Sequence, residues 1–156
     1  MLIEPTYTPK QYWFTILCSG LIVALLSIAA YFTLYWFLYV QQSFLFSLIY
    51  IIPLLGSTIT LAIFKHKFVW KEFTYGSAFL MSFMIEIISA LILSLTLYFT
   101  YKYGLETRID LYDSSEHLQS LMSPLAISLS MLIINVVLSL FYSLIIAIFA
   151  KRKKKE

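Results

Sequence analysis

Charged residues are scarce in this chain, and one long stretch has none at all. From Gln11 to Phe64, 54 consecutive positions carry no Asp, Glu, Lys or Arg. Charged residues make up 12% of the whole chain and hydrophobic residues 61%, whereas a typical soluble domain is about 25% charged. A chain this apolar would aggregate in water. The composition therefore excludes an ordinary soluble protein and favours lipid as the solvent.

Cysteine and recognisable catalytic motifs are equally scarce. Cys18 is the single cysteine, so the chain has no internal disulfide, and in its apolar setting we expect it to act as a small hydrophobe. The sequence contains no glycine-rich phosphate loop, no GxSxG, no HExxH and no CxxC motif. We therefore predict a non-enzymatic protein that uses no cofactor and no metal.

Four apolar runs are each long enough to cross a bilayer. They cover residues 12–39, 44–64, 73–101 and 124–150, and each reaches the ~20 residues that a helix needs to span ~30 Å of hydrocarbon. The first run is about twice the length of a secretory h-region, so we expect it to be retained. Because the runs do not alternate as barrel strands do, they predict an all-α membrane protein, a single domain of four transmembrane helices arranged up-down-up-down.

Basic residues gather in alternate connections. Nine of the eleven lie before the first run, in the connection 65–72, or in the tail, which holds Lys151, Arg152, Lys153, Lys154 and Lys155. The connection 102–123 is longer and acidic. Since cytoplasmic segments are enriched in Lys and Arg, we predict both termini in the cytoplasm, the acidic loop 102–123 outside, and the tail 151–156 against anionic lipid headgroups.

The acidic loop contains side chains that could chelate a cation. Asp110, Asp113, Glu116 and His117 lie close together in the sequence, and oxygen ligands suit hard cations. The loop lacks the fixed glycine and ligand spacing of known calcium loops. We therefore favour a solvated loop over a metal site, with Asp113 and Glu116 spaced to cap a short helical turn.

Glu86 is the most informative residue of the sequence. It lies near the middle of the third run, 13 residues after Phe73 and 15 before Tyr101. A charged carboxylate at that depth costs about 2.5–3.5 kcal/mol on insertion scales. We therefore expect the Glu86 side chain to face protein or a cavity, with its carboxyl group protonated.

Polar residues form a stripe on the third run and another on the fourth. The stripes comprise Ser82, Glu86, Ser89 and Thr96, and Ser128, Asn135, Ser139 and Tyr142. Spacings of three, four and seven residues place each set on one helix face. Counted from the same membrane edge, Asn135 and Glu86 have nearly equal depth, which predicts a hydrogen bond between them. Such a pair is either a structural contact, worth about 0.6 kcal/mol on average, or part of a binding site.

Small residues predict close helix packing. Gly20, Ala24 and Ser27 share one face of the first run, and Gly56 and Thr60 share one face of the second. Small side chains at such spacings allow helix backbones to approach in a membrane. We expect these faces to lie against neighbouring helices.

One set of features lies at the entry to the third run, its aromatic end, the acidic loop, the start of the fourth run and the lysine-rich tail: Phe73, Gly76, Ala78, Phe79, Tyr98, Phe99, Thr100, Tyr101, Ser123 and Pro124. In these features the chain resembles an uncharacterised family of small bacterial inner-membrane proteins, a domain of unknown function. The resemblance covers nearly the whole chain and is specific in the second half. It implies four helices, the inner membrane and no assigned activity, and it supplies no catalytic residues.

Two functional hypotheses follow from these observations. The first is a scaffold or accessory subunit for a membrane partner. The second is a small oligomeric carrier or channel for an ion, a proton or a lipid headgroup, using Glu86 and Asn135. An intramembrane enzyme ranks below both, because only Glu86 lies deep enough to act as an acid or base. The expected partners are the lipid bilayer and a membrane protein or a second copy, with no nucleic acid.

Overall fold

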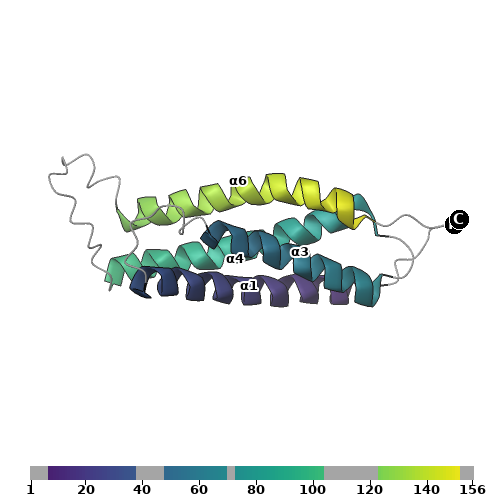
Figure 1. Cartoon of the computed structure of the whole chain (residues 1–156), viewed down its shortest axis with the longest axis horizontal. Helices are drawn as coiled ribbons and strands as arrows, with labels where there is room; N and C mark the ends of the chain where they lie inside the picture. The colour runs from purple at the N-terminus through teal and green to yellow at the C-terminus, as the bar shows by residue number, and fades with distance from the viewer. Residues whose placement is uncertain (1–6, 38–47, 70–72, 104–122, 152–156) are drawn as a thin grey trace, which may run out of the picture.

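Four long α-helices make up the described part of the chain. A computed structural model describes residues 7–37, 48–69, 73–103 and 123–151. The helices are α1 (Pro9–Phe37), α3 (Leu48–Phe68), α4 (Tyr75–Tyr103) and α6 (Pro124–Ala150). They lie along one long axis, and successive helices run in opposite directions (Figure 1). Each is long and apolar enough to cross a membrane, so the predicted up-down-up-down bundle is confirmed and the chain is a multi-pass membrane protein.

Helix α1 begins three residues earlier than the apolar run that predicts it. The Thr8 hydroxyl accepts the Gln11 N–H at 3.2 Å, and the Thr8 N–H donates to the Gln11 side-chain oxygen at 3.0 Å. This reciprocal pair is a capping box, and Pro9 occupies the first helical position, where proline fits. The start therefore depends on polar capping rather than on hydrophobicity.

Helix α3 extends further than expected at its C-terminal end. Its last turn contains Lys65, His66 and Lys67, which the sequence pattern assigns to a loop. Basic side chains suit this position because the C-terminal end of a helix carries partial negative charge. Lys102 lies in the last turn of α4 for the same reason.

The starts of α4 and α6 are set by hydroxyl caps. The Thr74 hydroxyl accepts the Ser77 N–H at 3.2 Å, so α4 begins two residues after the expected Phe73. The Ser123 hydroxyl accepts the Ala126 N–H at 3.2 Å, with Pro124 in the first turn as predicted. Residues 104–122 of the predicted acidic loop (102–123) and residues 152–156 of the tail lie outside the described residues.

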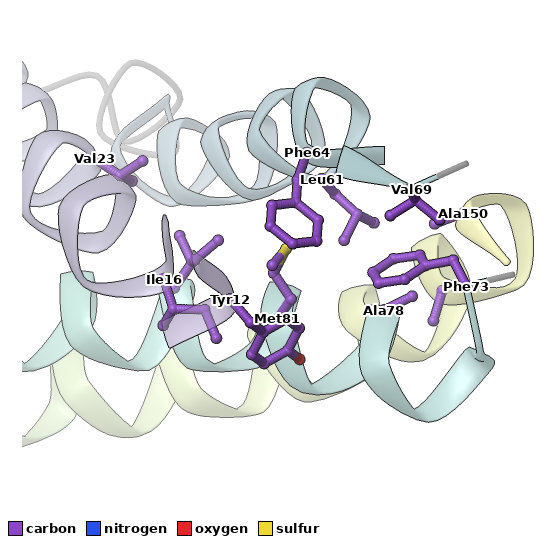
Figure 2. Packing of buried hydrophobic residues seen from close by; sticks show 12 residues of the cluster. Tyr12, Ile16, Val23, Leu61, Phe64, Val69, Phe73, Ala78, Met81 and Ala150 are labelled. Atoms are coloured by element: carbon purple, nitrogen blue, oxygen red, sulfur yellow. The ribbon is translucent and has the colours of Figure 1, made fainter. Parts of the chain in front are cut away.

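Helix α4 is the centre of the bundle. It packs against each of the other three helices, most extensively against α6. At one end of the bundle Tyr12, Phe64, Phe73 and Met81 form an apolar cluster that joins α1, α3 and α4 (Figure 2). A second cluster around Leu93 lies toward the other end. Glu86 and Ser89 of α4 lie between Ile85 of the first cluster and Leu93 of the second.

The small-residue faces pack closely, as predicted. A Cβ atom placed on Gly20 would lie 2.8 Å from Ile88 Cγ2 of α4, and one placed on Gly56 would lie 2.4 Å from Val23 Cγ2 of α1. Ala24 is fully buried. These contacts allow α1 to approach both α3 and α4.

The outward faces of the helices carry large apolar side chains. Leu25, Ile59, Ile133 and Phe149 are each more than half exposed. Exposing such surface to water is unfavourable by about 25 cal/mol per Å². An apolar outer surface around an interior that holds both apolar clusters and polar side chains fits a protein surrounded by lipid.

Candidate functional site

Glu86 lies at the centre of the bundle, as the sequence predicts. Its side chain is 0% exposed and faces protein rather than lipid. One turn of α4 before it stands Ser82, and almost one turn after it stands Ser89, both fully buried. These residues share one face of α4 because their spacings are four and three.

One oxygen of the Glu86 carboxyl group is well satisfied. Glu86 Oε1 accepts from the Ser57 hydroxyl of α3 at 2.5 Å and from the Ser82 hydroxyl at 3.1 Å. The Ser143 hydroxyl of α6 donates in turn to Ser82 Oγ at 3.2 Å. A hydrogen-bonded chain therefore runs from α6 through α4 to α3, and Glu86 is its common acceptor.

The other carboxyl oxygen has no such partner. Glu86 Oε2 and Ser89 Oγ are both buried, and neither makes a hydrogen bond within the described residues. Ser139 of α6 lies next to the Glu86 carboxyl group and interacts with it, but its hydroxyl does not meet Oε2 in hydrogen-bonding geometry. The site thus contains two unpartnered oxygens on one face of α4.

The predicted hydrogen bond between Glu86 and Asn135 is wrong. The Asn135 amide donates to the Met131 carbonyl of its own helix at 2.8 Å. Ser82 of α4 pairs with Ser143 of α6, and the two helices are antiparallel. Four residues onward in α4 therefore correspond to four residues back in α6, which places Ser139 level with Glu86.

This register explains why counting from the membrane edge failed. The count began at Phe73, but α4 begins at Tyr75, and the edge-based count takes no account of how far one helix is shifted along the other. The Asn135 position is level with the neighbourhood of Ser89, about one turn from Glu86. Asn135 is still buried between α4 and α6.

The rest of the two stripes divides into two groups. Ser82, Ser89 and Ser139 surround Glu86. Ser128 lies further along, where its carbonyl accepts from the Ser94 hydroxyl at 2.8 Å. Thr96 donates to the Ile92 carbonyl of its own helix at 2.8 Å. The four serines of the stripes are buried and Thr96 is half-buried, but Ser128 and Thr96 are not part of the Glu86 site.

Two residues of the site were not predicted from the sequence. Ser57 follows Gly56, and Ser143 lies four residues after Ser139. The second spacing extends the stripe of α6 by one turn and was a usable signal. Ser57 had no such signal, because Thr58 and Thr60 lie beside it in the sequence, and the pattern does not show which of these hydroxyls faces α4.

The electrostatic surroundings of Glu86 contain no cationic side chain among the described residues. The buried polar residues besides Glu86 are serines and one asparagine. Within the same residues no three His, Cys, Asp or Glu side chains gather as metal ligands. Of the basic tail, Lys151 is exposed after the end of α6, while Arg152, Lys153, Lys154 and Lys155 lie outside the described residues.

Comparisons with protein-family models, with curated proteins and with solved structures find no match.

Proposed function

We propose that this membrane protein is a non-enzymatic scaffold or accessory subunit that supports a larger membrane partner. The proposal is based on the hydrogen bonds that buried serine hydroxyls make between helices. Hydrogen bonds donated by the hydroxyls of Ser57, Ser82 and Ser143 join α3, α4 and α6. Such contacts hold helices in a fixed arrangement. A supporting subunit needs a fixed arrangement because its partner packs against a surface of constant shape.

The outer face of α6 is the surface we assign to that partner. Helix α6 packs mainly on α4, and its far side presents Leu129, Ile133, Val137 and Phe141, all exposed. These residues recur every four positions, so they form one continuous row on the helix. A partner helix could pack along this row in the membrane.

The proposed location is the bacterial inner membrane with both termini in the cytoplasm. The beginnings of α1 and α4 meet where Tyr12 donates to the Ser77 carbonyl at 2.6 Å, and α3 ends beside them. Lys10, Lys65 and Lys151 therefore gather at one end of the bundle. This clustering supports the cytoplasmic assignment of that end and the contact of the tail with anionic lipid. The resemblance to inner-membrane proteins agrees with it.

The supporting role is tested by crosslinking in living cells. A photo-reactive residue at Ile133 or Phe141 of α6 should capture one membrane protein, and deleting the chain should lower the amount of that protein. The same residue at Leu21, on the exposed face of α1, serves as the control and should give lipid adducts. Equal adducts from both helices, or an unchanged amount of the captured protein after deletion, would contradict the proposal.

The second candidate function is a small oligomeric carrier or channel that uses Glu86. It is favoured by one specific observation, the unpartnered Glu86 Oε2 beside the unpartnered Ser89 Oγ. Asn135, which the sequence pattern includes in this hypothesis, donates to its own helix and is left out of it. Ion flux into vesicles that contain the protein, abolished by Glu86→Gln, is the expected result; no flux would exclude this candidate.

A further inference from the structure

We infer that Glu86, Ser89 and Ser139 form a binding site for a small monovalent cation such as sodium inside the bundle. The inference names the ligand of the second candidate function and rests on the same carboxyl group. It does not require transport, because a bound cation could equally hold α4 and α6 together. Binding and flux are therefore measured separately.

The site contains two oxygen atoms that no described hydrogen bond satisfies. Glu86 Oε2 and Ser89 Oγ are buried and lack hydrogen-bond partners within the described residues. Leaving a polar atom buried and unpartnered costs about 1–3 kcal/mol. The two atoms belong to residues three apart on one face of α4, so one ligand on that face would satisfy both.

The charge of the site favours a monovalent cation. The four hydroxyls around the carboxyl group are neutral, and Glu86 is the only acidic side chain among the buried polar residues described. Buried charges in proteins are paired or coordinate a metal. A monovalent cation would neutralise one carboxylate, whereas a divalent cation would leave a net positive charge in a low-dielectric interior.

The chemistry of the ligands favours a hard cation. Every candidate ligand is an oxygen: the Glu86 carboxylate and the hydroxyls of Ser89 and Ser139. Hard cations prefer oxygen ligands, while softer metals use nitrogen or sulfur. Ser57 and Ser82 already donate to Oε1, so they fix the carboxyl group and leave Oε2 as the oxygen available to a cation. Ser139 completes the site from α6, at the level that the Ser82–Ser143 contact sets.

The inference is tested by the thermal stability of the purified full chain in detergent. Sodium chloride is titrated against choline chloride at equal ionic strength and alkaline pH, where protons compete less for the carboxylate. A ligand that binds only the folded state raises the unfolding midpoint as its concentration rises above its Kd. We expect a sodium-specific rise that saturates.

Three variants locate the site. Glu86→Gln should abolish the sodium effect, and Ser89→Ala should raise the half-saturating sodium concentration by about tenfold or more, as loss of a supporting metal contact does. Ser130→Ala, on an exposed position of α6, should leave the response unchanged. Ser89→Ala keeps every hydrogen bond described at Glu86 Oε1 and removes an unpartnered buried hydroxyl, so in choline chloride it should be at least as stable as the parent chain.

Two results would overturn the inference. Equal midpoints in sodium and choline would mean that a proton or a buried water satisfies Oε2. A sodium effect that survives Glu86→Gln would place the ion elsewhere. A sodium-specific rise without ion flux into vesicles keeps the cation site and removes only the carrier function.

Discussion

The two oxygens of the Glu86 carboxyl group have different surroundings, and this difference separates its structural from its chemical role. Oε1 accepts two hydroxyls, one of them from another helix. Oε2 accepts none within the described residues. A side chain that keeps the acceptor but loses the acid should therefore preserve the bundle, whereas one that loses both should weaken it.

This reasoning predicts the stability of two variants at Glu86. In choline chloride Glu86→Gln should have nearly the parent stability, because the amide oxygen still accepts from Ser57 and Ser82. Glu86→Leu should be less stable by roughly 1 kcal/mol, since both hydroxyls lose their acceptor and only Ser57 retains a described alternative, the Leu54 carbonyl at 2.9 Å. Thermal unfolding of the three proteins in one detergent measures the difference. A Gln variant much less stable than the Leu variant would show that the described hydrogen bonds are not formed.

The sequence allowed the position of Glu86 to be predicted but not its partners. A carboxyl group in the middle of an apolar helix must face protein, because lipid cannot solvate it, and this requirement is independent of the neighbours. Its partners depend on how α4 and α6 are shifted along each other. Side-chain packing sets that shift, and so depth counting chose Asn135 where the register places Ser139.

At the scale of the helices, the sequence predicts that each of the four helices exists but does not predict the residues at which it begins and ends. An apolar run of ~20 residues must be helical in lipid to satisfy its backbone, so all four helices followed from hydropathy. Their ends follow from capping instead. The Thr8–Gln11 capping box was present in the sequence, but it lies outside the apolar run. Lys65 and Lys67 lie in the last turn of α3. The first charged residues after an apolar run show where the membrane ends, but the helix continues beyond that point.

The glycines provide a matched test of how closely these helices pack. Gly56→Ala should destabilise the protein by about 1–3 kcal/mol, since its Cβ would lie 2.4 Å from Val23 Cγ2. Gly20→Ala should cost less, because Ile88 Cγ2 lies at 2.8 Å. Gly76→Ala is the control: nothing lies within 4 Å of its Cβ, so the variant should be as stable as the parent or slightly more stable.

A second substitution checks the cause of the Gly56 effect. If the clash with Val23 is responsible, Val23→Ala in the Gly56→Ala chain should cost less than Val23→Ala alone, and a double-mutant cycle measures this coupling. Additive costs in thermal unfolding would show that α1 and α3 do not meet at these two residues.

At the scale of the whole molecule, the fold and its orientation are separate questions. The bundle has apolar outer faces on α1, α3 and α6, so the same helices could insert either way round. Orientation depends on the charges at the two ends. The structure gathers Lys10, Lys65 and Lys151 at one end and places Lys102 at the end of α4 opposite to them. An uneven distribution of this kind determines topology in membrane proteins.

The orientation is tested by labelling single cysteines from outside the cell. In a chain with Cys18→Ser, cysteines are placed one at a time at Gln42, Lys67, Ser114 and Lys154. Because basic segments stay in the cytoplasm, a membrane-impermeant thiol reagent on intact cells should label the Gln42 and Ser114 positions only. Permeabilised cells provide the control and should allow labelling at Lys67 and Lys154 as well. Labelling at Lys67 in intact cells would reverse the assignment, since that residue lies in the last turn of α3, at the end of the bundle where the basic residues gather.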